Sequence, residues 1–396
     1  MKKTLKDLDF KNKKVLVRCD FNVPIKDGKI TDDLRIVSSI PTIKSIIDGK
    51  GIPILISHLG RPKGVPNEKL SLLPVASRLG ELLGKEVIFA KSDKVVDASV
   101  REKASMLKQG EVMLLENLRF REEEEKNDEN FSKDLASLAD FFINDAFGTS
   151  HRAHASNVGV AELLPSALGL LVEKEVGIMG KALSNPKLPF VVILGGAKIS
   201  DKISVIKNLI NKVDALLIGG AMANTFLLSQ GYSMGKSLVD TENTDFAREM
   251  LRKAKERGVA LVLPKDLVLT TEISDNANFR EVKADEISEQ EIAVDIGSET
   301  VAEFEKFVSN AGTVVWNGPM GIFEHKAFSK GTFEVAKMMA NSRAITIVGG
   351  GDSSAAVEQS GFSEKITHIS TGGGASLEFL EGKLLPGIEV IGDRDE

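Results

Sequence analysis

The chain has 396 residues, of which 42% are hydrophobic and 27% charged, the balance of an ordinary soluble globular protein. At roughly 150 residues per domain, this length predicts two or three domains, each able to bury its own core without disulfides or metals. The 51 basic and 57 acidic residues leave a net charge of −6, and one Trp and one Tyr offer few stacking surfaces, so nucleic-acid binding is excluded.

The cysteine content and the amino terminus bear on location. The lone cysteine, Cys19, excludes an internal disulfide and favours a reducing compartment. No apolar run approaches the roughly 20 residues of a membrane-spanning helix. The first residues, MKKTLKDLDFKNKK, are basic but have no apolar segment after them, so they are not a signal peptide. We therefore expect a cytoplasmic protein with no membrane partner.

In the first half of the chain, short apolar runs alternate with amphipathic stretches. Strands are predicted near residues 14–18, 53–57, 86–90, 111–116 and 141–146. Helices are predicted over 34–48, 72–83 and 129–140. The first helix has isoleucines on one face and Gly49 as its C-cap, and Pro41 within it predicts a kink or a restart. The acidic run REEEEK (121–126) predicts a solvated helix start or loop.

The second half repeats this alternation. Strands are predicted at 189–194, 214–218, 259–263, 313–316, 344–348 and 366–370. Near-continuous apolar strands separated by helices are typical of parallel sheets covered on both faces. The sequence therefore predicts an α/β protein with two doubly wound, Rossmann-like lobes. A helix pattern followed by a Pro-containing loop within 166–188 predicts the connector that would let the lobes swing.

Polar and cationic residues follow the predicted strands of the first half. These residues are Arg18, Asp20, Asn22, Arg35, His58, Arg61, Asn117, Arg119, His151, Arg152 and His154. In open α/β sheets, ligands bind outside the carboxyl ends of the strands. Because the guanidinium fork matches phosphate and carboxylate, converging arginines indicate a small polyanion. Any single one of these arginines could equally be a surface or salt-bridge residue.

Glycine-rich turns follow the predicted strands of the second half. They are LGGAK (194–198), IGGAM (218–222), WNGPMG (316–321), VGGGDS (348–353) and STGGG (370–374). We expect all five turns to lead into helices. Bare backbone N–H groups at a helix N-terminus can approach phosphates, so five such turns favour a nucleotide site. The alternative is tight packing at strand-to-helix turns, which a single turn would not distinguish.

Several other motifs are absent or incomplete. No G-x-G-x-x-G fingerprint occurs, and GYSMGKS (231–237) is one residue short of a P-loop and follows a helix pattern. The five histidines lack the spacing of a zinc site. Two adjacent Ser-His pairs lack a nucleophile elbow, so serine hydrolysis is a weak reading.

Taken together, the motifs resemble the phosphoglycerate kinase family closely. The matching segments are VRCDFNVP (17–24), SHLGRPKG (57–64), ENLRF (116–120), NDAFGTSHRAHAS (144–156), LGGAKISDK (194–202), VVWNGPMGIFE (314–324), VGGGDSSAA (348–356) and STGGGASLEFLEGKLLPG (370–387). They span nearly the whole chain in the family's order. Two departures are Cys19, where members more often have Val or Ala, and Ser298, where many have Pro. The second lies near the expected nucleotide pocket.

The resemblance implies a glycolytic kinase that transfers a phosphoryl group reversibly between 1,3-bisphosphoglycerate and MgADP, giving 3-phosphoglycerate and MgATP. It implies an N-terminal 3-phosphoglycerate domain (1–168), a hinge helix and linker (169–187), a C-terminal nucleotide domain (188–374) and a final segment (375–396) that packs back on the first domain. Mg²⁺ is the implied cofactor, and a monomer is expected. Hinge closure would unite the two substrates.

Carried over residue by residue, the resemblance also implies a site. Substrate-binding residues would be Asp20, Phe21, Asn22, Arg35, His58, Leu59, Gly60, Arg61, Arg119 and Arg152. Nucleotide-binding residues would be Gly195, Ala197, Lys198, Lys202, Gly219, Gly220, Gly297, Asn317, Glu324, Gly350, Gly351, Asp352 and Ser353. Arg35, Lys198 and Gly373 would be catalytic, and Asp352 would bind the metal.

Two other readings remain open from the sequence alone. One is an ATP-dependent kinase for another small acid, such as a carbamate or an acetylated amino acid, which would need fewer cations in the first half. The other is a non-catalytic, two-lobed anion-binding protein. Such a protein would not need Lys198, Lys202 and Asp352 together.

Overall fold

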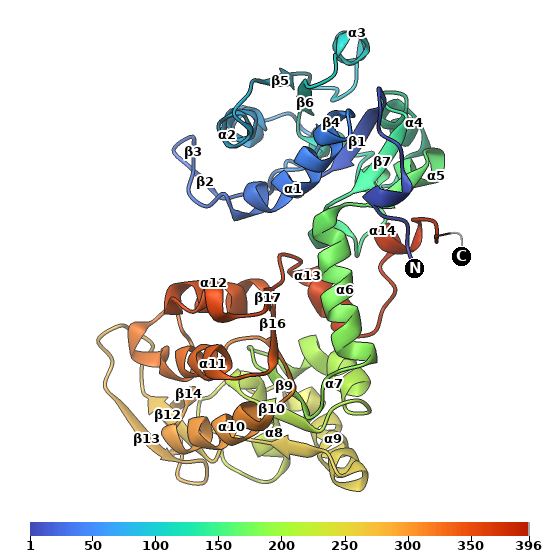
Figure 1. The fold of residues 1–396 in the computed structure, drawn as a ribbon. Coiled ribbons are helices and arrows are strands. Elements are labelled where there is room, and N and C mark those ends of the chain that lie inside the picture. The colour runs from blue at the N-terminus through green and yellow to red at the C-terminus, as the bar shows by residue number, and fades with distance from the viewer. Residues whose placement is uncertain (395–396) are drawn as a thin grey trace. The chain divides into compact units, whose positions relative to one another are not determined.

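The computed structural model describes residues 1–394, and its internal contacts divide the chain into two units (Figure 1). The first unit is residues 1–177 together with the segment from Leu384 onward, and the second is residues 178–383. The boundary falls within helix α6 (Leu170–Ser184), inside the connector predicted over 166–188. Each unit is built around its own sheet.

The sheet of the first unit has six parallel strands in the order β5-β6-β4-β1-β7-β8. Their bounds are β1 Lys14–Arg18, β4 Ile52–Ile56, β5 Val87–Ala90, β6 Val112–Leu115, β7 Phe141–Asn144 and β8 Ser166–Leu168. The five predicted strands are confirmed, and the three-residue β8 was not predicted. Strand β4 lies on one side of β1 and β7 lies on the other, so the strand order reverses at β1. We therefore expect a ligand at the carboxyl ends of β1 and β7.

Helices of the first unit are α1 Leu34–Asp48, α2 Leu73–Leu83, α3 Ala98–Met106, α4 Glu129–Ala136, α5 Val160–Leu163 and α14 Pro386–Glu389. Helix α1 runs through Pro41 without a restart and ends at Gly49, whose N–H donates to the carbonyl of Ser45 (3.0 Å). Helix α4 ends four residues before the predicted position 140, with Ser137 as its C-cap. A short hairpin, β2 (Ile25–Lys26) and β3 (Lys29–Ile30), was also not predicted.

The C-terminal segment belongs to the first unit. The Gly387 N–H donates to the carbonyl of Ser150 (2.9 Å), and Asn144 at the end of β7 donates to the carbonyl of Gly387 (2.7 Å). At the far end of the segment, Arg394 pairs with Asp7 (2.7 Å). These contacts hold the last described residues against the N-terminal sheet.

The main sheet of the second unit has parallel strands in the order β11-β10-β9-β15-β16-β17. Their bounds are β9 Phe190–Leu194, β10 Ala215–Ile218, β11 Ala260–Val262, β15 Thr313–Asn317, β16 Ile345–Gly349 and β17 His368–Ile369. All six are near their predicted positions. The order reverses between β9 and β15, which is the position where doubly wound sheets bind nucleotides.

A second, antiparallel sheet in this unit was not predicted. It has the order β13-β12-β14, with β12 Asp266–Thr270, β13 Phe279–Lys283 and β14 Ile292–Ile296. The helices of the unit are α7 Ile203–Leu209, α8 Gly220–Ser229, α9 Thr244–Arg257, α10 Ser298–Asn310, α11 Lys330–Asn341, α12 Gly351–Ser360 and α13 Gly374–Leu380. Helix α10 packs against α11, and α11 packs against α12.

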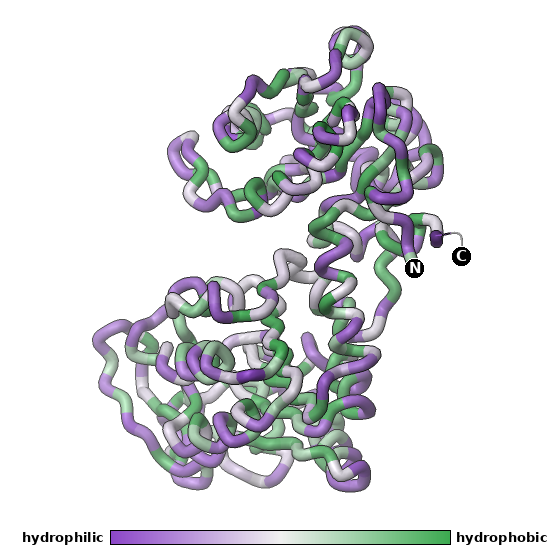
Figure 2. Tube along the Cα trace, in the orientation of Figure 1, coloured by the Kyte–Doolittle hydropathy of each residue, from purple (hydrophilic) through white to green (hydrophobic). Residues whose placement is uncertain are grey.

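Hydrophobic residues gather along the strands of each unit, while hydrophilic residues lie along outer helices and loops (Figure 2). Strands β4, β6, β9, β10 and β15 are buried throughout. Burying a Val, Leu, Ile or Phe side chain contributes about 1.5–3 kcal/mol, so each unit has a core of its own. Within residues 1–394, no helix has the length and apolar character needed to cross a membrane.

Candidate active site

The first unit brings most of the predicted substrate-binding residues together at the carboxyl ends of its strands, and we call this group the cationic half-site. Arg35, near the start of α1, pairs with Asp20 beyond β1 at 2.5 Å. Asn22 accepts a hydrogen bond from the Gly60 N–H (2.9 Å), and Arg119 donates to the carbonyl of Gly60 (3.0 Å). The loops after β1, β4 and β6 are therefore joined by these contacts.

The remaining predicted substrate residues divide into exposed and buried ones. Arg61 and Arg152 are exposed, and Arg152 contacts the ring of its neighbour His151. Phe21 and Leu59 are buried in the core, so only their backbone can meet a ligand. The half-site thus has exposed arginine side chains next to a buried apolar core.

Two buried histidines, His58 and His154, lie among these arginines. Burial, followed by the charges of Arg18 and Arg119, lowers the pKa of His58 well below its ordinary value. The same causes lower the pKa of His154 to about 3. Both rings are therefore neutral at physiological pH, because a further positive charge there would be buried beside guanidinium groups.

The prediction that the acidic run REEEEK (121–126) is solvated is wrong for one residue, Glu124. Glu124 is fully buried, and both of its carboxylate oxygens accept hydrogen bonds from Ser156, at 2.5 Å from the hydroxyl and 3.0 Å from the N–H. The turn lies against residues 154–156, since the carbonyl of Glu124 accepts from the Ala155 N–H (2.9 Å). Glu122, two residues earlier in the same run, is exposed, as expected.

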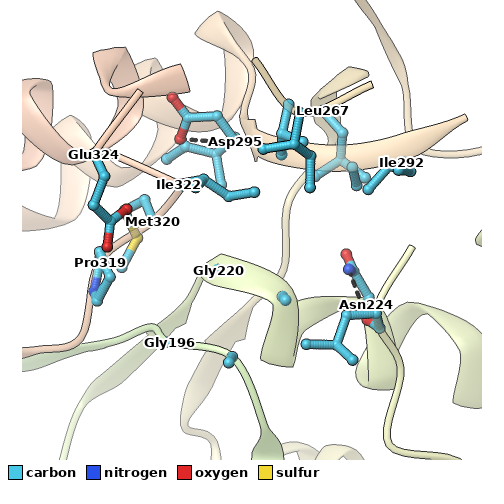
Figure 3. Close-up of a pocket in the computed structure, with 18 of the residues that line it drawn as sticks. Gly196, Gly220, Asn224, Leu267, Ile292, Asp295, Pro319, Met320, Ile322 and Glu324 are labelled. Atoms are coloured by element: carbon cyan, nitrogen blue, oxygen red, sulfur yellow. Dashed lines mark hydrogen bonds between the residues drawn. The ribbon is translucent and has the colours of Figure 1, made fainter. Parts of the chain in front are cut away.

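In the second unit, four of the five glycine-rich turns border a cavity of about 360 Å³, and the turn at 370–374 does not line it (Figure 3). Backbone at Gly196 and Gly220 forms one side, and apolar side chains including Leu267, Ile292 and Ile322 form the other. Four of the predicted nucleotide residues line it, namely Ala197, Gly220, Glu324 and Asp352. A cavity with a backbone wall, an apolar wall and few polar groups suits a flat base with a phosphorylated tail.

Close packing of the turns explains why they are rich in glycine. Gly220 has φ +65°, and a Cβ there would lie 2.6 Å from the Gly196 nitrogen and 2.8 Å from the Pro319 oxygen. A Cβ on Gly195 would lie 2.1 Å from the same oxygen. Three of the five turns lead directly into α8, α12 and α13, but the turns at 194–198 and 316–321 lead into a 3₁₀ turn and a loop. The expectation that all five enter helices was wrong for these two.

A polar network connects the ends of β15 and β16. The Lys202 ammonium donates to the Asn317 side chain, which donates in turn to the carbonyl of Gly349 (2.9 Å). Ser353 accepts a hydrogen bond from the Gly318 N–H (2.6 Å). Burial lowers the pKa of Lys202, and the carboxylates of Asp201 and Asp352 oppose that shift.

The other predicted residues of this unit are also at strand ends. The Lys198 side chain is exposed and makes no hydrogen bond or ion pair within residues 1–394. Gly219 follows β10, where a Cβ would lie 2.3 Å from the sulfur of Met320. Gly350 and Gly351 begin α12, and Gly373, with φ +50°, precedes α13. We call Lys198, Lys202, these turns and the cavity the glycine half-site.

Gly297 does not line the cavity. It follows β14, and a Cβ there would lie 2.3 Å from the carboxylate of Asp266, which accepts from the N–H groups of Glu299 and Thr300 at the start of α10. Ser298, the departure from the family pattern, donates its N–H to Glu281 (2.7 Å). The need for glycine at position 297 thus arises from this helix cap.

Sequence reasoning missed most of the apolar wall. Leu267 and Ile292 lie on the antiparallel sheet that was not predicted, so nothing placed them near the cavity. Met320 and Ile322 stand inside the quoted segment VVWNGPMGIFE and could have been named from it. Asp295 also lines the cavity, and burial raises its pKa to about 7.

Asp352 is the candidate metal ligand of the second unit. Within the described residues, no group of three or more His, Cys, Asp or Glu side chains could hold an ion. Asp352 is exposed at the start of α12 and lines the cavity. This fits Mg²⁺, which takes one or two protein carboxylates when nucleotide phosphates and waters supply the other ligands.

An arginine cluster in one α/β unit and a nucleotide-sized cavity at the switch point of the other are features of a kinase for a small anionic substrate. The family model described as phosphoglycerate kinase matches residues 5–383. A phosphoglycerate kinase of Finegoldia magna is 58% identical over 99% of this chain and 100% of its own, and one of Clostridium tetani is 56% identical over 99% and 98%. The chain belongs to the phosphoglycerate kinase family.

Comparison with solved structures gives the same family. Phosphoglycerate kinase from Coxiella burnetii has a TM-score of 0.90 at 42% identity, covering 99% of each chain. The enzyme from Pyrococcus horikoshii has a TM-score of 0.84 at 34% identity, covering 98% of each chain. The chain is therefore a phosphotransferase of glycolysis that moves a phosphoryl group between 1,3-bisphosphoglycerate and ADP.

Proposed function

We propose that the two substrates bind to different units. The cationic half-site binds 3-phosphoglycerate, with Asp20 and Asn22 bonding the glycerate and His58, Arg61, Arg119 and Arg152 holding its phosphate. Charge supports this assignment, because arginine forks bind phosphate through paired hydrogen bonds. Phe21, Leu59 and Gly60 contribute backbone only.

The glycine half-site binds the nucleotide. The base and ribose occupy the cavity beside Gly220 and Glu324, and the phosphates extend toward Lys202 and the N–H groups at the start of α12. Backbone N–H groups at a helix start favour anions without adding a titrating group. Gly195, Ala197, Gly219, Gly350, Gly351 and Ser353 shape this path, and Asn317 holds Lys202. Gly297 shapes the edge of the site only indirectly.

Asp352 would hold Mg²⁺ together with the nucleotide phosphates. The ion would neutralise phosphate charge and so ease transfer of the terminal group. The open position of Asp352, its place at the cavity and its influence on Lys202 support this role. Lys202 itself adds a fixed positive charge on the protein side.

The chemistry requires charge stabilisation more than proton transfer. The acceptor is a carboxylate, with an ordinary pKa near 4, so it is ionised at neutral pH and needs no general base. The transferring phosphoryl group is loosely bonded in the transition state and spreads charge over its oxygens. Arg35 and Lys198 would stabilise that charge, and the N–H groups beyond Gly373 would add to it.

Substrates held by separate units cannot react until their reacting atoms meet. We infer that binding of both substrates closes the molecule about the segment 169–187, brings Arg35 and Lys198 to one phosphoryl group, and expels water. The Lys198 side chain supports this, because it is exposed and has no hydrogen bond or ion pair within residues 1–394, so it is available for a partner that arrives only on closure. We also propose a cytoplasmic monomer, as the lone buried Cys19 and the negative net charge suggest.

The segregation of arginines and glycine turns into different units carries the proposal, and calorimetric titration tests it. Arg119→Ala should weaken 3-phosphoglycerate binding at least about tenfold, which corresponds to about 1.4 kcal/mol, and leave MgADP binding unchanged. Lys202→Ala should do the reverse. A variant that weakens both ligands equally, while remaining folded by circular dichroism, would refute the assignment.

A further inference from the structure

A buried charged network lies directly beneath the cationic half-site. Its centre is Arg18, the last residue of β1, whose side chain is fully buried. The Arg18 Nε–H donates to the Ser156 hydroxyl (2.8 Å), which in turn donates to Glu124 Oε1 (2.5 Å). A second Arg18 nitrogen lies 3.9 Å from the same carboxylate and 3.2 Å from Nδ1 of His58.

Arg18 determines which ring nitrogen of His58 carries the proton. A guanidinium group has N–H donors and no acceptor, so the His58 nitrogen beside it must accept. In a neutral ring the proton then resides on Nε2. Nε2 makes no hydrogen bond within residues 1–394. It is not one of the buried side-chain atoms without a partner, so it keeps some exposure to solvent. His58 therefore offers an N–H donor to an incoming group.

The position of Arg18 depends on Glu124. The Ser156 side chain links the two, because its hydroxyl accepts a hydrogen bond from Arg18 and donates one to the Glu124 carboxylate. A guanidinium buried without a counterion is strongly destabilised, so Arg18 stays in this pocket only with a carboxylate nearby. Glu124 is the one carboxylate within 4.0 Å of the Arg18 side chain among the described residues.

We propose that Glu124 is a positioning residue for phosphoryl transfer: through Ser156 and Arg18 it fixes His58 as the Nε2–H tautomer, a neutral hydrogen-bond donor for the anionic substrate. The substrate clause rests on the proposed function above, whereas the tautomer clause stands on the hydrogen bonds alone. Glu124 acts only through other residues and is not a catalytic group.

The charged surroundings of His58 make a neutral donor useful. The groups that face its ring are Arg18, Arg119, Arg35 and His154, and each disfavours protonation of the imidazole. A substrate phosphate therefore meets positive charge from the arginines and a directed N–H from His58. Because this donor stays neutral over the working pH range, its hydrogen bond does not depend on pH as an imidazolium would.

The test compares Glu124→Gln with Glu122→Gln, an exposed residue of the same acidic run. Two-dimensional NMR of ¹⁵N-labelled histidine reports the tautomer of His58, which His58→Gln assigns by removing its signals. We expect the wild type and Glu122→Gln to show one Nε2–H tautomer, and Glu124→Gln to show a mixture or the Nδ1–H form. The KM for 3-phosphoglycerate should rise about tenfold in Glu124→Gln while the KM for MgATP stays within about twofold.

Several outcomes separate the two clauses. If the tautomer of His58 is unchanged in a folded Glu124→Gln protein, the inference is wrong. If the tautomer changes but the KM for 3-phosphoglycerate does not, the tautomer clause holds, and the placement of the substrate at His58 is overturned.

Ser156→Ala gives a second route if Glu124→Gln fails to fold. It keeps both charges and removes only the hydroxyl that links them. We expect a partial change of tautomer and a KM for 3-phosphoglycerate about threefold higher. A Ser156→Ala protein with the wild-type tautomer and wild-type KM would contradict the role of this link.

Discussion

The two half-sites solve the same problem, holding a phosphorylated ligand, with different groups. The cationic half-site uses arginine side chains supported by buried ionic contacts, of which Arg18 and Glu124 are the centre. The glycine half-site uses backbone N–H groups, a lysine and an apolar wall. Side-chain charges give a strong, directional grip on a small substrate, whereas backbone and shape suit a larger ligand with a neutral base. The contrast predicts that the two halves will respond differently to substitution and to pH.

The largest expected effects come from the residue on each side that faces the transferring group. Arg35→Ala and Lys198→Ala should each lower kcat at least about a hundredfold, equivalent to about 2.7 kcal/mol, because each removes charge stabilisation from the transition state. Lys198→Arg should also fail, since a planar fork does not replace a compact ammonium at a crowded position. Steady-state kinetics measures this, and a variant within threefold of wild type would exclude its residue from the role.

A backbone change should affect the glycine half-site alone. In Gly220→Ala, the new Cβ would press on the Gly196 nitrogen and the Pro319 oxygen, and the residue would be held at φ +65°. We expect the KM for MgATP to rise about tenfold, or about 1.4 kcal/mol, with the KM for 3-phosphoglycerate unchanged.

Gly258→Ala is the matched control for this change. Gly258, at the C-terminal end of α9, has φ +70°, and a Cβ there would have nothing within 4 Å. That variant should retain wild-type kinetics. Equal kinetics in both variants would mean that the turns at Gly196 and Gly220 do not approach the nucleotide.

A further expected effect is the pH dependence of stability that His154 contributes on the cationic side. Since the pKa of His154 is about 3 in the folded protein and about 6.5 when unfolded, the unfolded chain binds a proton that the folded chain does not. Its contribution to stability is present above about pH 6.5 and declines as pH falls toward 3. The free energy of unfolding in urea should therefore drop between pH 7 and pH 5 by about 1–2 kcal/mol more in wild type than in His154→Gln.

One buried carboxyl in the same unit shifts stability the other way. Burial raises the pKa of Asp145 to about 8, so its contribution declines as pH rises from about 4 to 8. Wild type and His154→Gln both retain Asp145, so its effect cancels when the two proteins are compared. His325→Gln, a half-buried histidine that pairs with Asp275 in the second unit, serves as the control. Identical pH dependence in wild type and His154→Gln would contradict the account.

The sequence anticipated the parallel strands well, because fully buried strands are continuous apolar runs. The antiparallel sheet was not predicted because β13 and β14 mix charged with apolar residues and so lack a continuous apolar run. The hairpin at 25–30 had a readable signal in Asp27-Gly28, both of which have positive φ. Because the antiparallel sheet was not predicted, the cavity-lining residues Leu267 and 292–296 were not predicted either.

The charge pattern of residues 121–126 gave a wrong prediction for Glu124, and the reason is physical. A run of four glutamates is usually solvated, and composition cannot show that one of them has a buried arginine opposite. Glu124 is buried because Arg18 and Ser156 meet it from segments distant in the chain. Local patterns therefore predicted the residues that face ligands, while the groups that support them emerged only from the folded structure.

Energy transfer between two labels tests most directly whether the two half-sites form one reacting site. Ser99→Cys on α3 and Ser309→Cys on α10 are exposed positions in different units, and the thiol of Cys19 is buried with a raised pKa, so it resists labelling. We expect 3-phosphoglycerate and MgADP together, a pair that cannot react, to raise transfer efficiency well beyond the sum of their separate effects. An active labelled enzyme whose efficiency stays at the ligand-free value with both ligands saturating would contradict closure.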